Sequence, residues 1–171
     1  MFKKILQKHG SFLLALGAAI CLCFFFYIAF FPESKTPATP EQMWDVFVSQ
    51  GYEPHDATQR YIKEYPNAED VLICCYVVET DDLHFEYHNF NNDGDAFNIY
   101  QQARSYLYDE NAHLPSAETE KSMSNFSIYT ITAGGKYSVA IWVGNTAIYA
   151  YCDEENASLI DEIRKEIGYT P

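Results

Sequence analysis

The sequence lacks the short motifs that mark common catalytic and cofactor sites. It has no glycine-rich phosphate loop, no G-x-S-x-G nucleophile motif and no C-x-x-C pair. Nucleotide binding, serine hydrolysis and dithiol chemistry are therefore not indicated. We expect no bound cofactor, and enzymatic activity is not the leading hypothesis.

Basic residues are scarce after residue 31. Three of the eleven Lys and Arg residues come before it, whereas all 24 Asp and Glu residues come after it. The later part of the chain thus holds eight basic against 24 acidic residues, a formal net charge of −16. Because so negative a surface repels phosphate backbones, we do not expect nucleic acid as a partner.

Charge is absent from residues 11–31, SFLLALGAAICLCFFFYIAFF. A helix over this stretch would be about 31 Å long, enough to cross a bilayer core of ~30 Å. The basic residues 1–10 precede it, which predicts a cytoplasmic N-terminus and an extracytoplasmic C-terminal domain in the cell membrane. The stretch ends in Phe30, Phe31 and Pro32 rather than in small residues. This favours an uncleaved, single-pass signal anchor over a cleaved or lipidated segment.

The remaining chain predicts a Pro-rich linker at residues 32–40 and one domain at residues 41–171. A helix should begin at Pro40, because Thr39 and Gln42 form a T-x-x-Q capping box. Residues 111–125 are polar and are expected to be irregular. Apolar patterns predict further helices after Asp56, at 94–110 and at 156–167, and strands near 71–79, 83–90, 126–133, 136–143 and 146–152. The fold class is α+β: an antiparallel sheet of about five strands (hairpin, helix, three-strand meander) with helices packed on it.

Two glycine-containing turns set the register of the last three strands. Gly134-Gly135 and Gly144-Asn145 are two-residue loops of the type that favours positive φ. Ile128, Ile141 and Ile148 then lie opposite one another on one face of the sheet. The other face carries an aromatic group that could bind a partner, unless the N-terminal helices or residues 111–125 cover it. Its members are Tyr129, Ile131, Trp142, Tyr149 and Tyr151.

A weaker candidate site lies on the strand at 83–90. His84, Glu86 and His88 alternate along one strand face, and a two-residue loop at Asp81-Asp82 places Cys75 opposite His88. These side chains could serve a metal-dependent or thiol hydrolase. The two histidines are ~13 Å apart along the backbone, so all three side chains cannot hold one zinc ion. The simpler explanation is an ordinary solvated strand face.

Cysteines outside residues 11–31 number three, so no complete disulfide framework can form. Cys74 and Cys152 fall on the same face in the register above. A disulfide between them requires their strands to be neighbours; buried free thiols are the alternative.

Several short segments carry a resemblance to a known class of protein. They are Ala96-Phe97-x-x-Tyr100, Asn125-Phe-Ser-Ile-Tyr129, Trp142-Val-Gly-Asn-Thr146-Ala-Ile-Tyr149 and Ile167-Gly-Tyr169. With these segments the chain resembles uncharacterised, membrane-anchored extracytoplasmic proteins of Gram-positive bacteria. That resemblance implies a small α+β domain of unknown function and no catalytic residue.

Three hypotheses follow for the function. The first is a non-enzymatic, membrane-tethered extracytoplasmic module that binds an envelope protein, a peptide or a glycan. The second is a hydrolase built on Cys75, His84, Glu86 and His88. The third is a structural subunit of a membrane assembly.

Overall fold

The computed structural model describes residue 20 and residues 34–170. The helices are α2 (Pro40–Ser49), α3 (Thr58–Glu64), α4 (Asp93–Asn111) and α5 (Ala157–Glu166), with short 3-10 turns η1 (Pro66–Ala68) and η2 (Glu154–Asn156). The strands are β1 (His55–Asp56), β2 (Leu72–Glu79), β3 (Leu83–Phe90), β4 (Ser116–Ser122), β5 (Phe126–Ala133), β6 (Lys136–Val143) and β7 (Thr146–Asp153).

The strands form one antiparallel sheet of seven strands, in the order β1-β2-β3-β7-β6-β5-β4. The expected number of about five strands is therefore wrong. One addition is the two-residue strand β1, which pairs with β2. The other is β4, which occupies the segment expected to be irregular and is exposed along its whole length. A strand without apolar side chains gives no alternating hydrophobic signal, which is why its sequence does not reveal it.

The expected transmembrane helix at residues 11–31 lies, apart from residue 20, outside the described residues. Within the part of the chain that the structure describes, no helix is both long and apolar enough to cross a bilayer. The fold class is corrected accordingly to a seven-stranded antiparallel sheet with helices. The membrane, single-pass and signal-anchor assignments find no support.

The register of the meander is confirmed. Ile128 pairs with Ile141 and Ile141 with Ile148, and both connecting loops contain two residues. Gly134, Gly135 and Gly144 have φ values of 58°, 78° and 51°, which residues with a side chain rarely adopt. The glycines therefore fix which residues of β5, β6 and β7 share a face.

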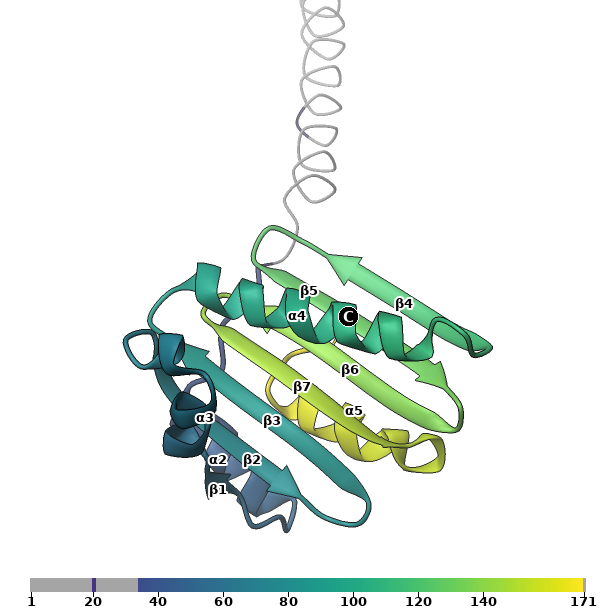
Figure 1. The fold of residues 1–171 in the computed structure, drawn as a ribbon, viewed down its shortest axis with the longest axis horizontal. Coiled ribbons are helices and arrows are strands. Elements are labelled where there is room, and N and C mark those ends of the chain that lie inside the picture. Colours follow the sequence, from purple (N-terminus) through teal and green to yellow (C-terminus); the bar gives the residue numbers. More distant parts are fainter. Residues whose placement is uncertain (1–19, 21–33, 171) are drawn as a thin grey trace, which may run out of the picture. The chain divides into compact units, whose positions relative to one another are not determined.

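Helices cover both faces of the sheet (Figure 1): α3 and α4 lie in front of it, and α2 and α5 lie behind. The face under α2 and α5, which we call the closed face, has one continuous apolar cluster that includes Phe47, Phe85 and Ile141. The rings of Phe47 and Phe85 meet edge to face, with their centroids 5.3 Å apart. This face supplies the main core of the domain.

Residues 34–39, expected to be part of an extended linker, are instead fixed to the closed face. Ala38 is buried. Its backbone N–H donates to the Tyr169 hydroxyl at 2.7 Å, and its carbonyl accepts a hydrogen bond from the Tyr87 hydroxyl at 2.6 Å. The compact unit that contains the sheet accordingly begins at Ser34. Tyr169 thus joins the first segment of this unit to the last, and Tyr87 joins it to β3.

Candidate functional site

The opposite face of the sheet, which we call the groove face, carries the aromatic group identified in the sequence. Its members do not form a single open patch, because α4 packs over them. Tyr129 and Ile131 are buried, and Trp142 and Tyr149 are partly buried. The Trp142 ring meets Phe97 of α4, with centroids 4.8 Å apart. Only Tyr151 is exposed, at 37%. The cover is the predicted helix at 94–110, not the N-terminal helices or residues 111–125.

The groove face has two apolar clusters rather than one. One lies beneath α3 and the start of α4 and contains Cys75, Val77 and Phe90. The other lies beneath the rest of α4 and contains Tyr129 and Ile131. Between α3 and α4 the structure has an open hollow of about 500 Å³. We call it the tyrosine groove. This volume lies within the usual range for sites that bind small molecules or side chains.

Four elements build the tyrosine groove. Helix α3 and its C-cap contribute Tyr61 and Tyr65, and β3 contributes His84, Glu86 and His88. Helix α4 contributes Ile99, Gln102, Ala103 and Tyr106, and β7 contributes Tyr149 and Tyr151. The structure therefore brings both sets of sequence candidates, the three residues of β3 and part of the aromatic group, into one site. The two sets lie together because β3 pairs with β7, and the register of this pair places His84 opposite Tyr151 and Glu86 opposite Tyr149. The His84 ring stacks on Tyr151, with centroids 4.7 Å apart and an interplanar angle of 19°.

His88 is the most unusual residue of the groove. Its side chain is 2% exposed, and neither ring nitrogen has a hydrogen-bond partner among the described residues. The Tyr61 ring packs against it edge to face at 4.8 Å. Burial lowers the pKa of His88 to about 4, although the nearby Glu86 carboxylate acts in the opposite direction. The imidazole is therefore neutral at pH 7 and presents one donor and one acceptor nitrogen.

Glu86 supplies negative charge at the centre of the groove. Its carboxylate oxygen lies 3.0 Å from His84 Nε2, and its second oxygen lies 3.8 Å from His88 Nε2, beyond hydrogen-bond distance. Burial disfavours the charged carboxylate, but the hydrogen bond with His84 and electrostatic contributions from His88, His84 and Arg60 together outweigh it and hold the pKa of Glu86 below its ordinary value. Glu86 is therefore ionised at neutral pH, and its side chain remains 26% exposed to the groove.

The hydrolase hypothesis requires an activated thiol at Cys75 or a group of metal ligands. Cys75 pairs with His88 across the β2–β3 register, as expected, but no hydrogen bond joins the thiol to the His88 ring. Burial, with a contribution from Glu86, raises the pKa of the Cys75 thiol to about 12, so the thiolate nucleophile is not formed at neutral pH. Among residues 34–170, no three His, Cys, Asp or Glu side chains are placed to hold a metal ion.

The candidate disulfide between Cys74 and Cys152 is not formed, and both are buried free thiols, the alternative considered above. Strand β3 lies between β2 and β7, so the two cysteine strands are not neighbours. Cys74 pairs with Asn89 and Cys152 with Leu83, six residues apart on β3. Their backbones are therefore about 20 Å apart along the strand direction alone, far beyond the reach of a disulfide.

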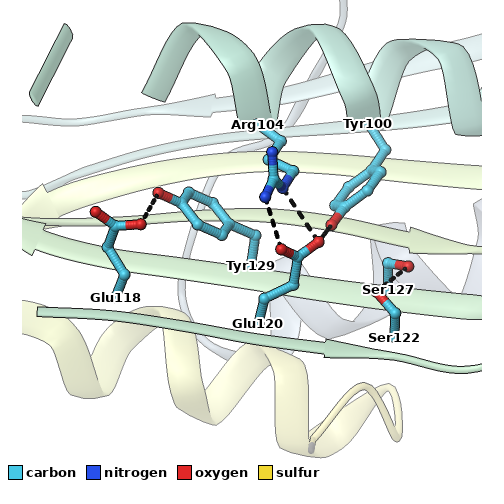
Figure 2. Close-up of polar contacts among 7 residues, drawn as sticks. All are labelled: Tyr100, Arg104, Glu118, Glu120, Ser122, Ser127 and Tyr129. Carbon is cyan, nitrogen blue, oxygen red and sulfur yellow. Dashed lines mark hydrogen bonds and ion pairs between the residues drawn. The ribbon is translucent and has the colours of Figure 1, made fainter. Parts of the chain in front are cut away.

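A polar network holds α4 in place on the side away from α3 (Figure 2). Arg104 of α4 donates two hydrogen bonds to Glu120 of β4, at 3.1 and 2.7 Å, and Tyr100 donates one at 3.0 Å. Tyr129 of β5 donates to Glu118 at 3.0 Å. Each of these side chains bonds to another member of the network, so its geometry is that of a structural clamp. The clamp fixes one wall of the groove.

Sequence reasoning did not identify Tyr61, Tyr65, Gln102 and Tyr106 as site residues. Tyrosine suits a core and a binding surface equally well, because its ring is apolar and its hydroxyl is polar. Helical periodicity alone does not tell which neighbour a tyrosine faces. The high tyrosine content, 14 of 171 residues, is the one signal that could have drawn attention to them.

No family model matches the chain, and no curated protein matches it. Among solved structures, the chain is similar to a GTP-binding regulator from Thermotoga maritima. The sequences are 15% identical, the TM-score is 0.45, and the likeness covers 78% of this chain and 88% of the other. So distant a likeness carries no argument about function. The resemblance to membrane-anchored proteins of Gram-positive bacteria is not tested by these comparisons.

Proposed function

We propose that residues 34–170 form a non-enzymatic binding module whose ligand site is the tyrosine groove. The observation that carries the proposal is His88, a buried imidazole without a hydrogen-bond partner on the floor of an open hollow. A buried polar group without a partner costs roughly 1–3 kcal/mol of stability. Such groups are rare in native proteins, and each calls for an explanation. A ligand that bonds to His88 supplies one.

The surroundings of His88 support binding rather than catalysis. Tyr65 and Tyr106 stand on opposite walls of the groove and are each about half exposed. Exposed tyrosines on a rigid framework offer large contact areas at low entropic cost. The buried Cys75 thiol lacks the depressed pKa of a nucleophile. The hydrolase hypothesis is therefore weaker than the binding hypothesis.

The test is a nuclear magnetic resonance titration of the full, ¹⁵N-labelled chain with three probes: benzylamine, benzoate and N-acetylglucosamine. We expect at least one probe to shift resonances of groove residues on α3, β3 and α4. The Tyr106→Ala variant should weaken these shifts at least threefold. Tyr108→Ala is the matched control, because Tyr108 lies on the same helix, is equally exposed and does not line the groove. Shifts scattered over the surface, or equal effects of the two variants, would overturn the proposal.

A further inference from the structure

The tyrosine groove continues in both directions along α4. On one side it adjoins a hollow of about 430 Å³, with which it shares Tyr61, Tyr65, Ile99 and Gln102. On the other side it adjoins a hollow of about 270 Å³, with which it shares Tyr106, Tyr149 and Tyr151. We call the three hollows together the α4 groove. Because neighbouring hollows share walls, one elongated ligand can occupy all three.

The length of the α4 groove follows from the helix that lines it. Its residues on α4 recur every three or four positions, from Asp95 through Ile99, Gln102 and Tyr106 to Glu110. This is one face of the helix. Fifteen residues at about 1.5 Å each give roughly 22 Å. An extended peptide of six or seven residues, at ~3.3 Å each, has the same length.

The charged residues that line the α4 groove determine which sign of ligand charge it attracts. Acidic side chains lie at both ends and in the middle: Glu64 and Asp95 at one end, Glu86 at the centre and Glu110 at the other end. Lys136 is the one Lys or Arg residue that lines any of the three hollows. It is already ion-paired with Asp153. A groove of this charge attracts cationic groups and repels anions.

We infer that the α4 groove binds an extended peptide rich in lysine or arginine, an inference that rests on the proposed function. Glu86 receives an ammonium or guanidinium group in the middle of the peptide, and the tyrosines flank the cation with their ring faces. One ring nitrogen of His88, which lines the central hollow, bonds to a backbone N–H or C=O group of the peptide. Glu64 and Asp95 at one end and Glu110 at the other take further basic side chains. A neutral glycan matches the rings and leaves the carboxylates unused.

The test is fluorescence anisotropy with the full chain and two labelled heptapeptides, Lys-Leu-Lys-Tyr-Lys-Leu-Lys and its counterpart with Glu in place of every Lys. We expect the lysine peptide to bind at least tenfold more tightly at 50 mM salt. Glu86→Gln should weaken its binding about tenfold. The control Glu41→Gln, which removes the same charge on α2 at the opposite face of the sheet, should change binding less than twofold. Asp95→Asn provides a second groove variant if Glu86→Gln unfolds the domain.

Three outcomes would overturn the inference. Equal binding of the two peptides means that charge does not select the ligand. Equal effects of Glu86→Gln and Glu41→Gln mean that the attraction comes from the net charge of the whole domain. Tighter groove binding by chitotetraose than by the lysine peptide means that the site recognises a glycan. In the last case the small probes still shift groove resonances, so the proposed function stands while the peptide inference fails.

Discussion

On the closed face of the sheet the described buried polar side chains have partners, whereas on the groove face one does not. Tyr87 and Tyr169 bond to Ala38, and Tyr169 also lies 2.8 Å from the Thr146 hydroxyl. The buried Arg164 guanidinium bonds to Asp161 and Tyr137. On the other face, His88 is as deeply buried and bonds to none of the described residues. The same sheet therefore has one side with saturated polar contacts and one side without.

The helices show the same contrast. Helices α2 and α5 cover a single continuous core, but α3 and α4 cover two clusters with the tyrosine groove between them. Complete packing favours stability, and an open site with an unsatisfied group sacrifices part of it. The difference indicates that the closed face holds the domain together and that the groove face carries its function. Four experiments test that division.

The largest effect should come from the closed face. Phe85→Ala removes a fully buried ring that packs edge to face on Phe47. We expect a loss of about 4 kcal/mol in the free energy of unfolding, measured by urea denaturation, because the substitution leaves a cavity in a dense core. The counterpart on the groove face, Tyr151→Ala, should cost less than about 1 kcal/mol, because Tyr151 is already exposed. Similar losses for both would refute the division.

The pH dependence of stability should reveal His88. Its pKa is lowered in the folded state, so between about pH 6.5 and pH 4 the unfolded chain takes up a proton that the folded protein does not. Stability should therefore fall as the pH is lowered through this range, by up to about 3 kcal/mol. His88→Leu should remove this component. Urea unfolding of the original protein and of His88→Leu at several pH values isolates the contribution of His88. All other titratable groups are present in both proteins, so their contributions cancel in the difference. Parallel curves would show that His88 has a partner or is not buried.

The Tyr87 hydroxyl on the closed face should contribute measurably to the free energy of unfolding. Tyr87→Phe removes the hydrogen bond to the Ala38 carbonyl and leaves that buried acceptor unsatisfied. We expect a loss of about 1.5 kcal/mol in the free energy of unfolding. Hydrogen exchange at Ala38 should also become faster, because residues 34–39 are then less firmly attached. Unchanged exchange would show that the remaining hydrogen bonds of this segment, to Tyr169 and to Asn125, hold it without Tyr87.

The smallest effect should come from the clamp between α4 and β4. The Arg104–Glu120 pair is about one-third exposed, so a double-mutant cycle with Arg104→Ala and Glu120→Ala should give a coupling of roughly 0.5 kcal/mol that declines with added salt. Groove binding should weaken along with it, because the clamp fixes one wall. A coupling above about 2 kcal/mol would indicate that the clamp, rather than the closed face, carries much of the stability.

Local signals in the sequence predicted the central elements well. The Thr39–Gln42 capping box is present, with both reciprocal hydrogen bonds, at the start of α2. The β2–β3 pairing of Cys75 with His88 follows from the short loop between the two strands. Helix α4 is capped by Asn92 and begins at Asp93, one residue before the predicted range 94–110. Caps and tight turns act within a few residues, so the sequence alone is sufficient to locate them.

Strand β4 and the order of the sheet were beyond such signals. β4 is held by pairing with β5 and by the contacts of Glu118 and Glu120, partners that lie 5 to 20 residues away in the chain. The pairing of β3 with β7 likewise joins strands that are far apart in the sequence. It places His84 beside Tyr151 and separates Cys74 from Cys152. No local pattern encodes a pairing across more than 60 residues.

The sequence by itself thus determined the acidic character of the domain, the turns, and which side chains of each strand share a face. Those properties depend on composition and on the two-residue period of a strand. The tertiary structure decided which helices pack on each face of the sheet. Because α4 crosses β5, β6 and β7 and stops short of α3, the aromatic group is mostly buried, and a groove remains over Glu86 and His88. Helix placement depends on packing between distant elements, and only the folded chain brings those elements together.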